Sequence, residues 1–172
     1  MQATGIDTLD GLMARYVAGR LPEPARVLVE AHLALSARNR PLVKTLEGAA
    51  GIELEELPPS TIADRKDRLA AIFDSPPMVS ASPHDVRDPV LPDILRQFVG
   101  VGIDDIPWKT KMPGYREHLI GEIDGCEANL LWIKPGRRMP SHTHDGSEIT
   151  LVLDGAFFDA NGRYGRGDIA VA

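Results

Sequence analysis

The chain has 172 residues, 43% hydrophobic and 26% charged, which is enough for one ordinary domain or two small ones. Its net charge of −6 argues against direct nucleic-acid binding, because phosphate contacts need many Lys and Arg side chains. No apolar run is long enough to span a bilayer, and the N-terminus lacks the basic and apolar regions of a signal peptide. The single cysteine, Cys126, excludes an internal disulfide, so the sequence predicts a cytoplasmic protein without membrane contact.

The spacing of apolar residues predicts four helices within residues 7–73. Asp7 or Thr8 can cap the first helix, Asn39 can cap the third, and Ser60 or Thr61 can begin the fourth. The residues predicted to form the four apolar sides are Leu9, Leu12, Met13, Tyr16 and Val17; Ala25, Leu28, Ala31, His32 and Leu35; Leu42, Val43, Leu46 and Ala50; and Ile62, Leu69, Ile72 and Phe73. Together they predict a small helical bundle over residues 1–74.

A proline-rich stretch and then a β-rich stretch follow the helices. Residues 75–92 contain five prolines and little apolar periodicity, which predicts an extended linker. From about residue 94, strand-like segments alternate with turn signals such as Asp124-Gly125 and Asn161-Gly162, which are typical of β-hairpins. The clearest strands are 116–123, 128–133 and 149–153. Many short strands joined by glycine-containing turns predict a barrel or sandwich over residues 93–172.

The residues that most clearly indicate chemistry lie between Gly136 and Gly155. His142 and His144 are two residues apart, so on a strand both imidazoles point to one side, and Glu148 can return to them after a short turn. Two imidazoles and a carboxylate suit a divalent metal ion, zinc first, with iron, manganese or nickel as alternatives. Without a metal, the two histidines would be surface residues of a polar loop. The spacing is similar to the first conserved motif of the cupin superfamily, which favours the metal site.

The end of the chain resembles the beginning of the second cupin motif. That motif usually opens with a Gly-Asp step, matched here by Gly167-Asp168, and then supplies one more histidine. The chain stops at Ala172 before such a histidine, so we expect a cupin (jelly-roll) β-barrel that is truncated at its C-terminus. The predicted fold class is therefore multidomain α + β, a helical bundle followed by this barrel.

Taken together, the chain resembles the ChrR-type anti-sigma factors, which join a small helical anti-sigma domain to a C-terminal cupin. The resemblance is strongest in three segments of the β-rich part and weaker in the helices. The similar segments are 112–119, 130–136 and 141–155, with 16–19 and 31–33 in the helices. It implies an anti-sigma-like domain at 1–74, a linker at 75–92 and a cupin domain at 93–172. It also implies that the partner is an alternative sigma factor of the extracytoplasmic-function type, which the helices keep from RNA polymerase.

One departure from the family pattern concerns the helical part. Zinc-binding members carry His-x3-Cys-x2-Cys in the second helical region, whereas this chain has His32 followed by Ser36 and Asn39. Without thiolates a tight structural zinc site is not expected here. We therefore predict that His32 is a helix residue at the domain surface or the edge of the core, and not a zinc ligand.

Three functions are consistent with these sequence features. The leading one is a zinc-free anti-sigma factor that regulates transcription, with a metal-binding cupin as sensor. The alternative is a metal-dependent cupin enzyme of dioxygenase or isomerase type, in which His118 and Glu122 could line the barrel. An outer, polar strand face for those two residues is the simpler expectation. The third function is a binding module with a structural metal, and a homodimer through the cupin also remains open.

Overall fold

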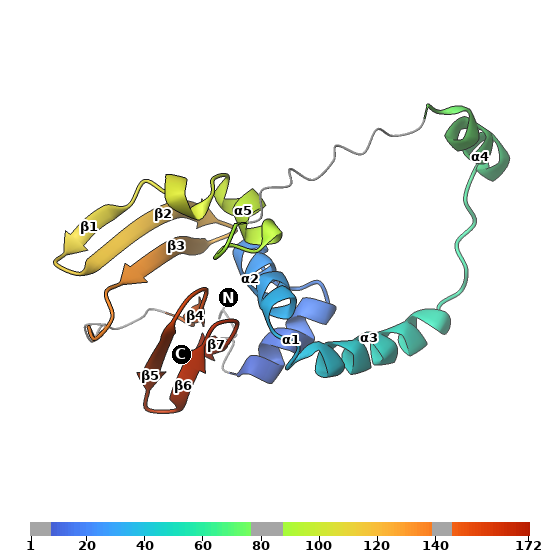
Figure 1. The fold of residues 1–172 in the computed structure, drawn as a ribbon. Helices are drawn as coiled ribbons and strands as arrows, with labels where there is room; N and C mark the ends of the chain where they lie inside the picture. Colours follow the sequence, from blue (N-terminus) through green and yellow to red (C-terminus); the bar gives the residue numbers. More distant parts are fainter. Residues whose placement is uncertain (1–7, 77–87, 139–145) are drawn as a thin grey trace.

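A computed structural model describes residues 8–76, 88–138 and 146–172 of the chain (Figure 1). Within these residues, four helices precede the strands and a shorter fifth helix leads into them. The helices are α1 Leu9–Val17, α2 Glu23–Leu35, α3 Arg40–Glu55, α4 Arg65–Asp74 and α5 Asp93–Val99, and the 3-10 helix η1 is Ile103–Asp105. The predicted order of a helical part followed by a β-rich part is confirmed.

The strands form three small antiparallel groups. They are β1 Lys109–Met112, β2 Tyr115–Ile123, β3 Cys126–Ile133, β4 Ile149–Leu151, β5 Ala156–Asp159, β6 Gly162–Gly165 and β7 Ile169–Val171. β1, β2 and β3 form one sheet, β4 pairs with β7, and β5 and β6 form a hairpin. Asp124 (φ 51°) and Gly125 (φ 74°) both adopt left-handed conformations between β2 and β3, as a two-residue hairpin turn requires.

The predicted helix starts agree with the structure at α1 and differ from it at α3 and α4. Thr8 caps α1 as expected, its hydroxyl accepting a hydrogen bond from the Gly11 amide at 3.1 Å. Asn39 stands at the start of α3, but its side chain makes no capping hydrogen bond. The prediction that α4 begins at Ser60 or Thr61 was wrong, since it begins at Arg65.

Helix α5 was also missed, because strands were predicted from about residue 94. Pro92 precedes it in an extended conformation, and Gly100 ends it with a left-handed φ of 85°. Seven residues are too few for a helical period to stand out from a short strand pattern. The helix buries Leu95 against Val27 and Ala31 of α2.

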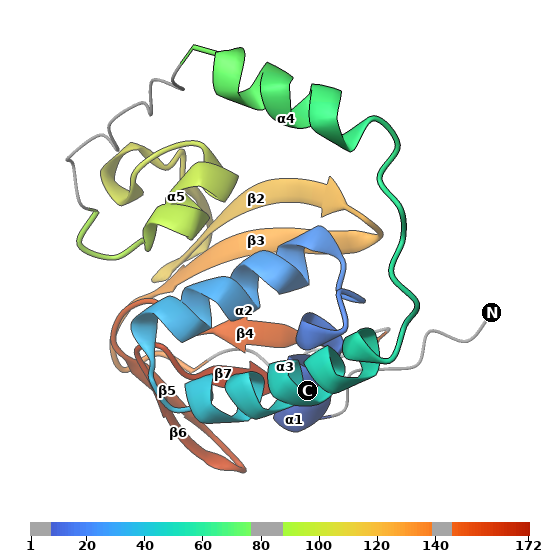
Figure 2. The same cartoon turned by 90° about the vertical axis from the view of Figure 1, so that its right-hand side faces the viewer.

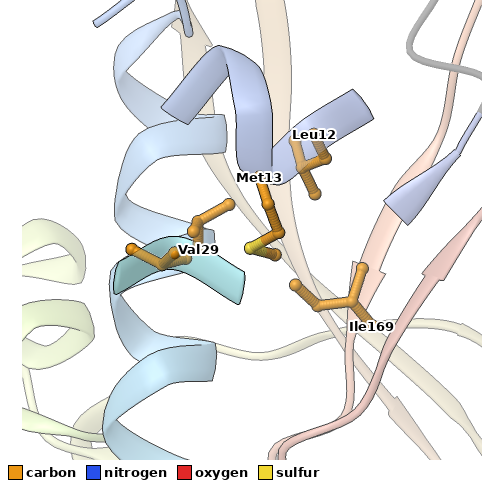
Figure 3. Packing of buried hydrophobic residues seen from close by; sticks show 5 residues of the cluster. Leu12, Met13, Val29 and Ile169 are labelled. Atoms are coloured by element: carbon orange, nitrogen blue, oxygen red, sulfur yellow. The ribbon is translucent and has the colours of Figure 1, made fainter. Parts of the chain in front are cut away.

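The main hydrophobic core joins the helices to the β-rich part. Leu12 and Met13 of α1 pack with Val29 of α2, Val43 of α3 and Ile169 of β7. Figure 3 shows Met13 lying between Val29 and Ile169. In both overall views α2 runs beside β4 and α5 (Figure 1, Figure 2). Because these contacts cross from residues 9–46 to 149–171, the helices α1–α3 and the strands β4 and β7 stabilise one another.

Asp88 stabilises the beginning of the β-rich part through hydrogen bonds to its carboxylate. Its Oδ1 accepts hydrogen bonds from the amides of Val90 (2.8 Å) and Leu91 (2.7 Å), and its Oδ2 accepts one from Ile103 (2.7 Å). Partial burial alone would raise the pKa of the Asp88 carboxyl, but the amides of Leu91, Ile103 and Val90 together lower it below its usual 3.8. The charged carboxylate therefore holds the segment before α5 against η1.

We expect Asp88→Asn to lower the free energy of unfolding by about 1–2 kcal/mol, because an amide NH2 cannot accept from two faces of this turn. The folded-state pKa lies below the unfolded one. The stabilisation is therefore complete above the unfolded-state pKa near 3.8 and is lost as pH falls through the lower folded value. Urea unfolding at pH 7 and pH 3 measures both effects. The control is Asp104→Asn, an equal charge change at an exposed position of η1, and an equal effect there would contradict the argument.

Candidate functional site

Of the predicted metal ligands, Glu148 lies in the described residues, whereas His142 and His144 lie outside them. Glu148 immediately precedes β4 and continues its pairing with β7, since its amide donates to the Ala172 carbonyl at 2.7 Å. The Thr150 hydroxyl donates to Glu148 Oε1 at 3.3 Å. Among the described residues no group of three or more His, Cys, Asp or Glu side chains is placed to hold a metal ion. The site predicted from the sequence therefore stays a prediction.

The side of β4 on which Glu148 lies can be read from its neighbours. Ile149 and Leu151 pack against the helical core, so strand alternation places Glu148 and Thr150 on the opposite side, away from the helices. The pKa of the Tyr115 phenol on β2 is raised, first by burial and then by the negative charge of Glu148. Tyr115 is thus a neighbour of Glu148 that motif spacing did not reveal. A carboxylate on this side suits the donor set that the sequence predicts.

His118 and Glu122 do not form a second site. His118 pairs with the buried Leu130 of β3, so it shares the inner face of that sheet, contrary to the expected polar outer face. A bulge between Leu119 and Gly121 then shifts the alternation. Glu122 therefore points to the other face and is exposed. The pairing separates the two side chains that the enzyme alternative would have used together.

His32 is buried, which agrees with its predicted place on the apolar side of α2 and excludes the alternative position at the surface. Its imidazole Nδ1 hydrogen-bonds the carbonyl oxygen of Gly167, and its Nε2 lies 3.1 Å from the amide nitrogen of Asn39. Both ring nitrogens are thereby engaged, and the remaining family positions hold a hydroxyl, Ser36, and an amide, Asn39. Zinc prefers thiolate, imidazole and carboxylate ligands, so these residues do not fit a structural zinc ion.

Helix α4 and the end of α3 expose an apolar surface. Helix α4 buries none of its residues and lies apart from the other helices and the strands (Figure 2). The exposed apolar residues lie at the end of α3, on the segment that joins it to α4, and on α4 itself; we call this set the α3–α4 surface, and its members are Ile52, Leu54, Leu57, Ile62, Leu69, Ile72 and Phe73. Among the large apolar residues of α4, Phe73 is 82% exposed and Ile72 is 65% exposed. The sequence predicted an apolar side for α4, and the structure leaves that side uncovered, as at protein–protein contact sites.

Comparison with known proteins extends over both parts of the chain. Residues 96–171 match the family model of the ChrR cupin-like domain. The anti-sigma-E factor ChrR of Cereibacter sphaeroides is 34% identical over 165 residues, covering 95% of this chain and 76% of that protein. The crystal structure of Rhodobacter sphaeroides SigE in complex with the anti-sigma ChrR contains a chain that matches with a TM-score of 0.76 and 34% identity. That match covers 96% of this chain and 84% of the other, so the likeness includes helices and strands alike.

Proposed function

We propose that this chain, which belongs to the ChrR family of anti-sigma factors, binds an alternative sigma factor with its N-terminal helices. Sequestered in this way, the sigma factor does not reach RNA polymerase. The observation that carries the proposal is the α3–α4 surface, a set of large apolar side chains with no partner among the described residues. A relative of the same fold occurs in a crystal with the sigma factor SigE, which supports a sigma factor as the partner here.

The chemistry of the α3–α4 surface fits a protein partner. Burial of exposed aromatic and aliphatic side chains under a second protein is favourable, because water is then released from their apolar surface. A nucleic acid would instead require a basic face, and the chain as a whole is acidic. No described helix is long and apolar enough to cross a membrane. We place the protein in the cytoplasm, where sigma factors and RNA polymerase meet.

The β-rich part is proposed to be a metal-binding sensor. His142, His144 and Glu148 would hold one divalent ion, with zinc as first choice and iron, manganese or nickel as alternatives. The ion would supply a fixed positive charge and Lewis acidity at one side of the sheets. The half-buried Glu148, fixed by its backbone pairing with Ala172, would offer its carboxylate from the side of β4 that faces away from the helices.

Affinity capture tests the proposal directly. The tagged full-length protein is isolated from its own cells, and the bound proteins are identified and quantified by mass spectrometry. We expect an alternative sigma factor in near-equal molar amount, since sequestration requires a stoichiometric complex. Folded, metal-loaded protein that recovers no sigma factor would refute the anti-sigma function. Substrate screening for a cupin enzyme would then be the next experiment.

A further inference from the structure

His32 occupies an unusual place in the packing of the molecule. It lies in the last turn of α2, and only 1% of its surface is exposed. Among residues 8–76, 88–138 and 146–172 it is the one buried polar side chain. Burial of an imidazole is unfavourable unless its ring nitrogens are hydrogen-bonded. Its two partners, Gly167 and Asn39, come from different parts of the chain.

The partners fix the role of each ring nitrogen. The carbonyl oxygen of Gly167 can only accept, so Nδ1 of His32 carries the proton and donates it. Nε2 of the neutral ring then accepts from the amide NH2 of Asn39 at 3.1 Å. The use of the Asn39 side chain here explains why it does not cap its own helix. We call these two hydrogen bonds the His32 bridge.

On the side of the strands, the bridge ends in a tight loop. Gly167 has a φ of 86°, and a Cβ atom added there would lie 3.1 Å from the Cβ of Leu35 and 3.3 Å from that of Ser36. The loop backbone therefore presses directly on the end of α2. The Gly167 amide donates to the Val152 carbonyl at 2.8 Å, and the Val152 amide donates to the Asp168 carbonyl at 3.0 Å. The bridge thus reaches the end of β4, the strand that Glu148 precedes.

On the side of the helices, the bridge ends where α3 begins. Arg40, the first residue of α3, donates from Nε to the Leu33 carbonyl at 2.8 Å and from a terminal nitrogen to the Ala34 carbonyl at 3.3 Å. These bonds satisfy carbonyls at the end of α2 and fix the turn between the two helices. The direction in which α3 leaves this turn determines where the apolar end of α3 is presented. The turn and the loop at Gly167 are therefore held by one imidazole.

We propose that the His32 bridge is a metal-free joint that makes the helices α1–α3 and the β-rich part unfold as one cooperative unit. Its consequence for regulation rests on the proposed function: a change at β4 would reach the sigma-binding helices through Gly167 and His32. The cooperativity itself does not depend on a sigma factor. Failure of the cooperative unit can therefore be distinguished from failure of the proposed sigma-factor binding.

Urea unfolding of the full chain with two probes tests the joint. Far-ultraviolet circular dichroism at 222 nm follows the helices, whereas the two tryptophans, Trp108 and Trp132, follow the β-rich part by fluorescence. The wild type is expected to give coincident midpoints. In His32→Leu the helical midpoint is expected to fall about 1 M urea below the fluorescence midpoint, because the Gly167 carbonyl and the Asn39 amide lose their shared partner.

A matched core variant separates the joint from simple loss of stability. Val43→Ala truncates a buried side chain of the same core without touching the bridge, so both of its midpoints should fall together. Gly167→Ala changes only the strand side, and the contact with Leu35 should lower the helical midpoint there too. If His32→Leu does not fold, the two midpoints of Gly167→Ala test the proposal in its place. Separate midpoints in the wild type, or a Gly167→Ala effect confined to fluorescence, would overturn the proposal, as would coincident midpoints in His32→Leu.

Discussion

Placing two carboxylates on the exposed face of α4, by the double substitution Ile72→Asp and Phe73→Asp, is expected to weaken sigma-factor binding by about 100-fold or more. Both side chains are largely exposed in the free chain, at 65% and 82%. In a complex, burial of these two side chains would stabilise the interface. A carboxylate in the same place would instead lose its water without gaining a binding partner, which weakens the complex. Isothermal titration calorimetry with the purified sigma factor measures the loss.

The fold should survive this double substitution. Helix α4 contains no buried residue, so the circular dichroism spectrum and the urea midpoint should stay close to those of the wild type. Ala71→Asp is the matched control: it adds a carboxylate on the opposite side of the same helix, where helical spacing places it away from Ile72 and Phe73. Affinity retained in the control and lost in the double variant locates the contact on the apolar face. Unchanged affinity in both would exclude α4 from the interface.

The helices and hairpins could be predicted because their signals are local. Periodic apolar residues define α1–α3, and Asp124-Gly125 and Asn161-Gly162 mark two hairpins that the structure contains. Such patterns show that a face is buried, but they do not say which surface covers it. The sequence therefore did not reveal that Met13 packs between Val29 and Ile169, or that the apolar side of α4 has no cover in the described chain.

The contacts that the sequence did not reveal join residues that are far apart in the chain or depend on strand register. The burial of His32 depends on Gly167, 135 positions away in the chain, and no spacing rule connects the two. The inner position of His118 follows from its pairing with Leu130, and the outward turn of Glu122 follows from a bulge that only the register reveals. Asn39 was correctly placed at the start of α3, but its side chain bonds a neighbouring helix residue in preference to its own backbone. Local propensity therefore predicts where helices and strands lie better than it predicts which residues their side chains contact.

Removal of one predicted metal ligand, by His144→Ala, is expected to reduce the bound metal from about one ion per chain to almost none. Loss of an outer hydrogen-bond partner of a metal ligand already costs about 10–100-fold in affinity, and loss of a direct imidazole ligand should cost more. Inductively coupled plasma mass spectrometry of the purified chain measures the metal. A second readout is thermal unfolding with and without a chelator. The shift seen in the wild type should vanish in the variant, because a ligand that binds only the folded state stabilises that state.

His118→Ala is the matched control for the metal site. It also removes one histidine from the β-rich part, but from the face of β2 that pairs with Leu130 and not from the predicted motif. Its metal content should equal that of the wild type. Glu148→Gln should behave like His144→Ala, since an amide keeps the shape of the carboxylate but not its charge. Metal retained in both ligand variants would rule out the predicted site, whereas loss in both, with retention in the control, would place the ion beside β4. The ion would then lie on the strand that the His32 bridge reaches through Val152.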